Sequence, residues 1–489
     1  MSKPAGLLSA KSTSSSKSTS SGSLCFIWRL CSLSGAAASK LSENLFIMNE
    51  ELELTIEKTV FEGRALARQG RFVVFVDGAL PGERIRARLS YRKRRYAFAQ
   101  LLEVLEPSPQ RCASGCSAFG TCGGCSLLNM DYAAQLEQKR NFLLEALHAW
   151  PDVAACVAPV WGMEDPYFFR NKMVYSFGGS AEAPVLGMHR RGDFHAVVSA
   201  ETCRLQSPQA QEVLRRVLAW TRKHHWAPFD ERAKTGLLRD LTVREGKRTG
   251  QRMVMLTTTA LQAAVTELPG IVGDLATTVL HGISPPLHNA ARLERVEILS
   301  GSGVIAEQLN GLTFEVGVST FFQTNTLQAE KMFSLLAQWA ADAQPRVALD
   351  LYAGTGPIAF HLARLGRRVI AVETHPESVA AARRNQQRNN LPAIEWLAAD
   401  VEQAPEAVFA SQPDLIVVDP PRTGLHPRAA EKIVAAAAPH IFYVSCNPAT
   451  LARDLPRFRA ANYAVKRIQP LDMFPHSYHV ESLLWLSRA

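Results

Sequence analysis

The sequence that decides the fold is Arg346-Val-Ala-Leu-Asp350-Leu-Tyr352-Ala-Gly354-Thr-Gly356-Pro-Ile-Ala359. An apolar strand enters a glycine turn and a helix follows, so the backbone can approach a ligand closely at the helix N-terminus. About twenty residues further on, a second apolar strand ends in Glu373, where a carboxylate can bind ribose hydroxyls. This succession predicts a Rossmann-like α/β domain that binds a cofactor containing a nucleoside.

The surroundings of the turn favour S-adenosylmethionine over a dinucleotide. Asp350 precedes a single glycine turn, and no second feature that would read a phosphate accompanies it. S-adenosylmethionine has no phosphate to bind. A third strand ends in Asp400, which can meet the adenine amino group, and a fourth ends in Asp419 before Pro-Pro-Arg422.

The fifth predicted strand is Ile441-Phe-Tyr-Val-Ser-Cys446, and Asn-Pro448 ends it. A cysteine there lies at the edge of the sheet where α/β enzymes place their chemistry. A lone cysteine is more often a small buried hydrophobe, and the local pattern alone favours packing. The neighbouring strand end at Asp419 and the cofactor turn favour a nucleophile instead.

Composition sets the wider limits. The chain has 489 residues, 47% hydrophobic and 20% charged, which indicates a globular protein of about three domains. Its formal charge of +9 favours a nucleic-acid partner. No apolar run is long enough for a membrane-spanning helix. Nine cysteines, an odd number with one tight cluster, favour metal ligation in a reducing compartment, and we expect a cytoplasmic protein.

Residues 1–47 are rich in Ser, Lys, Ala and Gly and contain no acidic residue before Glu43. We interpret them as a disordered tail, or as the result of an upstream start codon with Met48 as the true beginning; a transit peptide is the alternative. From residue 48 to 107, short strands alternate with Gly and Pro turns and predict a small β-barrel. Seven basic residues between Arg84 and Arg95 suit a nucleic-acid surface, although a charge run is usually a solvated face. The stretch resembles a TRAM domain, a small RNA-binding barrel.

A cysteine cluster follows the barrel, with Cys112, Cys116, Cys122 and Cys125 separated by glycines and small residues. Thiolates at this spacing can hold zinc or an iron–sulfur cluster, and the spacing does not choose between them. The fourth ligand beside the last three is either Cys112 or a distant cysteine, for which Cys203 is a candidate. Residues 108–311 read as a central α+β domain, and residues 312–489 as the Rossmann-like domain.

Five ordered motifs resemble the RNA uracil-C5 methyltransferases, specifically the branch with a TRAM domain and a [4Fe–4S] cluster whose bacterial members include the large-subunit (23S) rRNA enzyme. The resemblance runs from about Met48 to the C-terminus. The motifs are Phe322-Gln-Thr-Asn325, Asp350-Leu-Tyr-Ala-Gly-Thr-Gly356, Asp419-Pro-Pro-Arg-Thr-Gly424, Ser445-Cys-Asn-Pro448 and His479-Val-Glu481.

The resemblance implies a role for each matching position. It makes Cys446 the nucleophile and Glu481 the general base. It implies contacts to S-adenosylmethionine and ligands of the cluster, leaving Cys112 as a bystander. One departure is Pro357, where the family usually has Asn, so that a side-chain contact is lost. The implied cofactor contacts are Gln323, Tyr352, Glu373, Asp400 and Asp419; the implied cluster ligands are Cys116, Cys122, Cys125 and Cys203.

By analogy with this class of sheet, the last strand should run antiparallel between the fifth and sixth, which brings Glu481 to the edge where Cys446 lies. We therefore predict a class I S-adenosylmethionine-dependent enzyme, acting as a monomer, that methylates C5 of a uridine in RNA, with 23S rRNA as substrate, through a covalent adduct with C6. Asp419 is left with two possible roles, in cofactor binding or as acceptor from uracil N3–H. The alternatives are a tRNA uridine-C5 methyltransferase, an RNA amino-group methyltransferase using Asp-Pro-Pro, and an inert RNA-binding scaffold.

Overall fold

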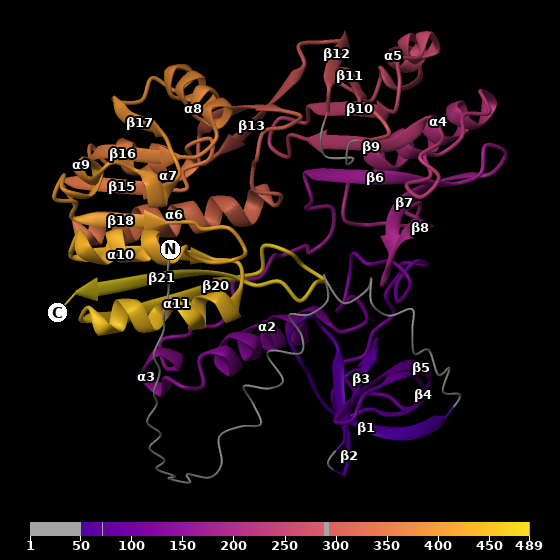
Figure 1. Cartoon of the computed structure of the whole chain (residues 1–489), viewed down its shortest axis with the longest axis horizontal. Coiled ribbons are helices and arrows are strands. Elements are labelled where there is room, and N and C mark those ends of the chain that lie inside the picture. The colour runs from indigo at the N-terminus through magenta and orange to yellow at the C-terminus, as the bar shows by residue number, and fades with distance from the viewer. Residues whose placement is uncertain (1–49, 71, 288–292, 489) are drawn as a thin grey trace, which may run out of the picture. The chain divides into compact units, whose positions relative to one another are not determined.

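The structure, a computed structural model, describes residues 50–70, 72–287 and 293–488 (Figure 1). These residues belong to one compact unit, Met48–Ala489. The predicted N-terminal extension, residues 1–47, lies outside the described residues. No helix of the described part is long and apolar enough to cross a membrane.

The N-terminal strands close into a five-stranded barrel of order β1-β2-β3-β5-β4, which confirms the predicted barrel. Its strands alternate buried apolar and exposed polar residues, as in β4, where Ile85, Ala87 and Leu89 point into the barrel core. The five strands are β1 (Glu51–Thr59), β2 (Ala65–Gln69), β3 (Phe72–Asp77), β4 (Arg84–Arg92) and β5 (Tyr96–Glu106).

The basic run on β4 is largely neutralised by its neighbours. Register brings acidic residues of β1 and β5 opposite the arginines, so that Arg88 pairs with Glu51 at 2.7 Å and Arg86 with Glu103 at 3.0 Å. Arg84 contacts acidic residues on both sides. Residues 93–95, in the turn of this hairpin, are also basic and exposed.

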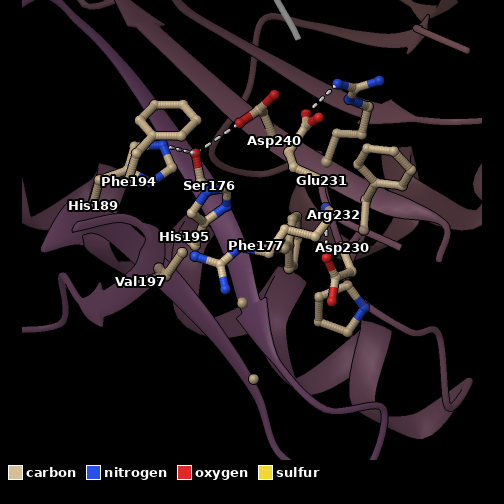
Figure 2. Close-up of a pocket in the computed structure, with 15 residues that line it drawn as sticks. Ser176, Phe177, His189, Phe194, His195, Val197, Asp230, Glu231, Arg232 and Asp240 are labelled. Atoms are coloured by element: carbon tan, nitrogen blue, oxygen red, sulfur yellow. Dashed lines mark hydrogen bonds and ion pairs between the residues drawn. The ribbon is translucent and has the colours of Figure 1, made fainter. Parts of the chain in front are cut away.

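The middle of the chain forms a seven-stranded sheet of order β12-β11-β10-β9-β6-β7-β8. Helix α4 (Pro208–Lys223) buries Val213, Leu214 and Val217 against it. Figure 2 shows a pocket lined by β6, β8 and residues 228–232. The strands are β6 (Lys172–Gly179), β7 (Pro184–Arg190), β8 (Asp193–Ser199), β9 (Leu238–Glu245), β10 (Arg252–Thr258), β11 (Thr278–Ile283) and β12 (Arg295–Ser300), accompanied by η2 (Ala263–Glu267) and α5 (Leu268–Val272).

The C-terminal sheet has the order β17-β16-β15-β18-β19-β21-β20, with β21 antiparallel to both of its neighbours. This is the class I methyltransferase arrangement, and it confirms the predicted position of the last strand. The strands are β15 (Val347–Leu351), β16 (Arg368–Glu373), β17 (Ile394–Ala398), β18 (Leu415–Val418), β19 (His440–Ser445), β20 (Tyr463–Leu471) and β21 (Glu481–Arg488).

Helices cover both faces of this sheet, and Figure 1 shows α6 and α7 near β15 and β16. They bury two apolar cores, one containing Phe333, Phe360 and Phe442, the other Leu351, Tyr443 and Leu484. The helices are α2 (Tyr132–Ala146), α3 (Pro151–Ala154), α6 (Thr326–Ala343), α7 (Pro357–Arg364), α8 (Pro376–Arg388), η3 (Val401–Gln403), α9 (Glu406–Phe409), α10 (Pro427–Ala435) and α11 (Pro448–Ala460).

A hairpin of β13 (Val304–Leu309) and β14 (Leu312–Gly317) joins the middle of the chain to the C-terminal sheet. Its apolar residues Ile305 and Phe314 lie in the same core as Phe360 of α7. The predicted boundary between residues 311 and 312 falls within this hairpin.

Candidate active site

The ends of β19 and β21 bring two of the predicted site residues together. Ser445 pairs with Ser482 in the antiparallel register, so Cys446 and Glu481 occupy the next position along the two strands. Cys446 is half-buried and Glu481 is buried at 3% exposure. A thiol and a carboxyl group thus share one edge of the sheet, beside the end of β18, which Asp419 follows.

Burial governs the protonation of this cluster. Burial, together with the neighbouring Glu481 and Asp419 charges, raises the pKa of Cys446 to about 12. Burial, with Asp419, likewise raises the pKa of Glu481 well above its ordinary value. The pKa of Asp419 rises to about 7 because this carboxyl is buried too. At neutral pH the site therefore holds a thiol together with carboxyl groups that bind protons readily.

Two polar residues that we did not predict as site residues lie beside this cluster. Arg422 Nη2 is 3.4 Å from His479 Nε2, and the Arg422 carbonyl accepts a hydrogen bond from Asn447 Nδ2 at 3.3 Å. Burial and Arg422 lower the pKa of His479 to about 3, so its imidazole is neutral. Arg422 is the only positive charge among the groups that shift the pKa of Glu481. Arg422 belongs to the motif Asp419–Gly424 and His479 to the motif His479–Glu481, and this membership is the sequence signal that could have identified both residues.

The glycine turn borders an open cleft of about 570 Å³ that contains three of the predicted cofactor residues, Tyr352, Glu373 and Asp400. Gly354 and Gly356 have φ values of 57° and 92°, which explains the need for glycine in this turn. The Glu373 carboxylate accepts hydrogen bonds from the backbone N–H groups of Gly354 and His375, each at 2.9 Å. A carboxylate held rigidly beside a glycine turn suits a nucleoside ribose, so these residues fit S-adenosylmethionine.

The buried side chain of Asp350 stabilises the glycine turn by a hydrogen bond to the helix that follows it. It is completely buried, and one of its oxygens accepts a hydrogen bond from the Ala359 N–H at 2.8 Å, while the other has no partner. Burial raises its pKa to about 8. This residue therefore joins the end of β15 to the first turn of α7.

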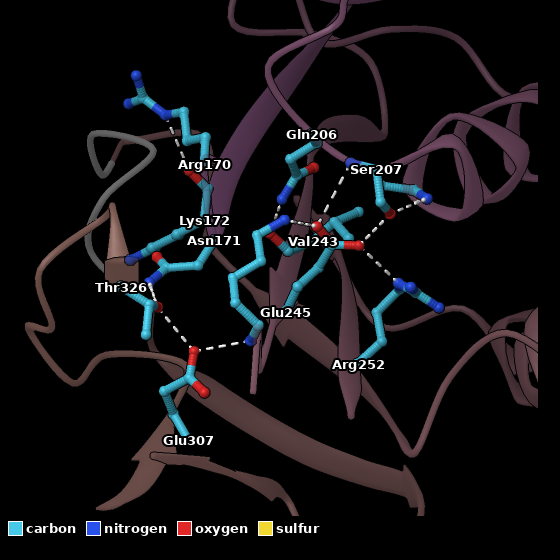
Figure 3. Close-up of polar contacts among 12 residues, drawn as sticks. Arg170, Asn171, Lys172, Gln206, Ser207, Val243, Glu245, Arg252, Glu307 and Thr326 are labelled. Carbon is cyan, nitrogen blue, oxygen red and sulfur yellow. Dashed lines mark hydrogen bonds and ion pairs between the residues drawn. The ribbon is translucent and has the colours of Figure 1, made fainter. Parts of the chain in front are cut away.

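Gln323 lies apart from the residues that line the cleft, in the loop before α6. Its carbonyl accepts a hydrogen bond from Asn171 Nδ2 at 2.8 Å, and the same amide donates to Thr326 Oγ1 at 3.0 Å. Figure 3 shows how Thr326 continues this chain to Glu307. Asp419 does not line the cleft either; its neighbours are Cys446 and Glu481.

The four predicted cluster cysteines line one small apolar pocket of about 50 Å³. Within the described ranges, no three His, Cys, Asp or Glu side chains are grouped so that they could hold a metal ion. Cys112 is exposed and does not line the pocket. Arg170 lines the pocket beside Cys116, Cys122, Cys125 and Cys203.

Three comparisons with known proteins all find similarity to RNA methyltransferases. Residues 304–489 match the family described as tRNA (Uracil-5-)-methyltransferase. An uncharacterized RNA methyltransferase of Clostridium tetani is 34% identical over 448 residues, covering 90% of this chain and 98% of the relative. One from Gloeobacter violaceus is 35% identical over 435 residues, covering 88% and 94%.

A similar solved structure is the Pyrococcus abyssi tRNA (uracil-54, C5)-methyltransferase in complex with S-adenosyl-L-homocysteine. It has a TM-score of 0.72 and 26% sequence identity, and the match covers 89% of this chain and 99% of the other. The likeness therefore extends over most of this chain and nearly the whole of the other.

Proposed function

The chain belongs to the tRNA (uracil-5-)-methyltransferase family of S-adenosylmethionine-dependent RNA methyltransferases, and we propose that it methylates uridine C5 through a covalent bond between Cys446 and uracil C6. The observation that carries the proposal is the register of β19 and β21, which puts Cys446 and Glu481 at adjacent strand ends. A thiol nucleophile and a base facing one ring are what this reaction needs.

Uracil C5 is a poor nucleophile until a bond forms at C6. The Cys446 thiol loses its proton to water, and the thiolate sulfur adds to C6. The electrons of the C5–C6 double bond then give C5 the character of an enolate carbon, which takes the methyl group. S-adenosylmethionine, when bound, supplies an electrophilic methyl group. Glu481 then accepts the C5 proton, the double bond re-forms, and the C6–S bond breaks to return the thiolate.

In the free site the Cys446 thiol and the Glu481 carboxyl must each lose a proton before these steps, because burial raises both pKa values. The raised pKa of Glu481 makes its carboxylate a stronger base than an exposed glutamate. We assign Asp419 to the substrate, as acceptor from uracil N3–H, because its neighbours are Cys446 and Glu481. Gln323, Tyr352, Glu373 and Asp400 are left as the contacts to S-adenosylmethionine.

We further propose that the cysteine pocket holds a [4Fe–4S] cluster through Cys116, Cys122, Cys125 and Cys203, and that the barrel is a TRAM domain. The convergence of four thiols on one pocket supports the first proposal. Protein purified without air should be brown and absorb broadly; a colourless protein containing zinc would contradict the proposal.

We propose 23S rRNA as the substrate, because the sequence motifs most resemble the bacterial large-subunit rRNA enzyme, and we expect a monomer in the cytoplasm. The seven described cysteines are all free thiols, as a reducing compartment allows. The alternative substrate is tRNA, on which the Pyrococcus relative acts. Mapping 5-methyluridine in rRNA and tRNA from cells with and without the protein decides between them.

The nucleophile is tested with Cys446→Ala. Methyl transfer to RNA should be abolished, while binding of S-adenosylmethionine, measured by calorimetry, should be unchanged because Cys446 does not line the cofactor cleft. Cys156→Ala, which removes a partly exposed thiol elsewhere, is the matched control and should keep full activity. Retained turnover in Cys446→Ala would rule out the covalent mechanism and favour amino-group methylation.

The base is tested with Glu481→Gln. This variant should form the Cys446–C6 bond and accept the methyl group, but lose the group that removes the C5 proton. An RNA–protein adduct that resists SDS should therefore accumulate, and it should be absent from the Cys446→Ala/Glu481→Gln double variant. If no adduct forms and turnover continues, another group is the base.

A further inference from the structure

A pocket of about 240 Å³ lies in the middle sheet, away from the residues of the active site (Figure 2). Its walls come from the end of β6, from His189 of β7, from β8, from residues 228–232 and from the start of β9. Figure 2 shows Ser176, His189 and Asp240 grouped on one wall, joined by hydrogen bonds to the Ser176 hydroxyl. The volume is below the roughly 300–1,000 Å³ of pockets for drug-sized ligands, so the pocket suits one flat ring system.

An aromatic ring is exposed at the mouth of this pocket. Phe194 is 64% exposed, although a phenylalanine is normally buried. Its ring stacks on His189, with centroids 4.0 Å apart and planes at 22°, which fixes its orientation. One preoriented aromatic face is thus presented outwards beside the exposed side chains of His195 and Arg232. Exposed aromatic rings with basic neighbours are the stacking platforms of single-stranded RNA sites.

The acidic residues of the pocket differ in how strongly they repel the phosphates of RNA. Glu231 pairs with Arg239 at 2.7 Å and with Lys234 at 2.9 Å, and Asp230 accepts hydrogen bonds from the N–H groups of its own turn. Asp240 is buried at 7% exposure and accepts a hydrogen bond from Ser176 at 2.9 Å. A carboxyl at the base of an aromatic pocket is an acceptor for the N–H groups of a base edge.

The pocket is connected to the active site by one strand. β6 runs from Lys172, two residues after the Arg170 whose charge helps to lower the pKa of His479 beside the Cys446 site, to Ser176 in the pocket wall. The four steps from Lys172 to Ser176 cover about 13 Å at about 3.3 Å per residue. Single-stranded RNA crosses such a distance in a few nucleotides, so a strand whose target uridine enters the active site can reach this pocket.

We infer that this pocket binds one unpaired base of the RNA substrate, a few nucleotides from the target uridine. The base stacks on Phe194 and donates hydrogen bonds to Asp240, and Arg232 and His195 lie near its phosphate. The inference rests on RNA being the substrate of this enzyme. The pocket thus adds a second contact that recognises the RNA, away from the uracil ring that is methylated.

The test uses the full-length protein and substrate RNA, with binding measured by fluorescence anisotropy. Phe194→Ala should raise the Kd for RNA about 5- to 100-fold, the range for loss of one stacked base, with unchanged affinity for S-adenosylmethionine. Phe194→Trp should restore tight binding because it restores the stacking face. Ile298→Ala is the matched control, because Ile298 is 57% exposed on β12 at the opposite end of the same sheet, and it should leave Kd unchanged.

The occupant is identified by photocrosslinking with RNA in which one base at a time near the target is replaced by a thio-analogue. Crosslinks should map to the peptide containing Phe194 and His195, from one nucleotide position, and Asp240→Asn should weaken them. Wild-type affinity in Phe194→Ala, or crosslinks only elsewhere, overturns the inference while leaving the methyltransferase intact. Failure of the wild-type protein to bind or methylate any RNA would instead overturn the proposed function.

Discussion

At the scale of single residues, the buried carboxyl group of Asp350 beside the cofactor turn makes the stability of the protein depend on pH. Its folded-state pKa of about 8 lies above its ordinary value of 3.8, so folding binds a proton between these pH values. The contribution of this group to stability is therefore fully present at low pH and is lost as pH rises through about 8. The loss is on the order of a few kcal/mol, because the ionised carboxylate is completely buried.

Asp350→Asn should remove this pH dependence. The amide keeps an oxygen that can accept from the Ala359 N–H but cannot ionise. Thermal unfolding at pH 5, 7 and 9 should show a smaller fall in Tm towards pH 9 than in the wild type. Asp342→Asn is the control, because its side chain is 51% exposed and should change Tm little at any pH. Parallel Tm curves for Asp350→Asn and wild type would show that the buried carboxyl is not what titrates.

At the scale of elements, the contact between the start of β6 and the loop before α6 positions Gln323. Asn171 Nδ2 donates to the Gln323 carbonyl and to Thr326, and the Asn171 N–H donates to the Thr324 carbonyl at 2.9 Å. Thr326 in turn donates to Glu307 at 2.7 Å. Because Gln323 is proposed to contact the cofactor, this network joins the central sheet to cofactor binding (Figure 3).

Asn171→Ala should raise the KM for S-adenosylmethionine roughly 10-fold, corresponding to about 1.4 kcal/mol for the lost hydrogen bonds, with a smaller effect on kcat. Asn389→Ala is the matched control: the Asn389 side chain likewise joins two segments, through hydrogen bonds to the backbone of Thr313 and Asn385, but away from this loop. Both variants should lose some stability, and only Asn171→Ala should change KM. Equal KM values in the two variants would show that the network is merely structural.

The elements that sequence could predict are those that a local pattern specifies. Apolar runs ending in Glu373 and Asp419 predicted β16 and β18, and the class of sheet predicted where β21 lies. The pairing of Arg88 with Glu51 depends on the register between β4 and β1, which no local pattern encodes. Asn171 and Gln323 are separated by 152 residues, and the pocket at Phe194 is built from four strands and residues 228–232, so neither could be read from spacing.

At the scale of the whole molecule, a buried ion pair joins α2 to the segment that leads into β21. The Lys139 ammonium contacts the Asp472 carboxylate, and both side chains are 0% exposed. Lys139 also donates to the Phe474 carbonyl at 2.9 Å, and Tyr132 donates to Asp472 at 2.9 Å. Burial lowers the pKa of Lys139. The chain that reaches Glu481 is thus anchored on a helix more than 300 residues earlier in the sequence.

Lys139→Met should destabilise the protein by about 3–5 kcal/mol, because Asp472 is left as an unpaired buried charge. Lys139→Met/Asp472→Leu removes that charge as well and should recover much of the stability measured by denaturant unfolding. The exposed pair Arg459–Asp152 also joins α11 to the region of α3 across the molecule, and Arg459→Met should change stability little. If the pair only stabilises, the double variant regains kcat along with stability. If it also positions Glu481, kcat stays low in a stable double variant, and the adduct seen in Glu481→Gln accumulates there too.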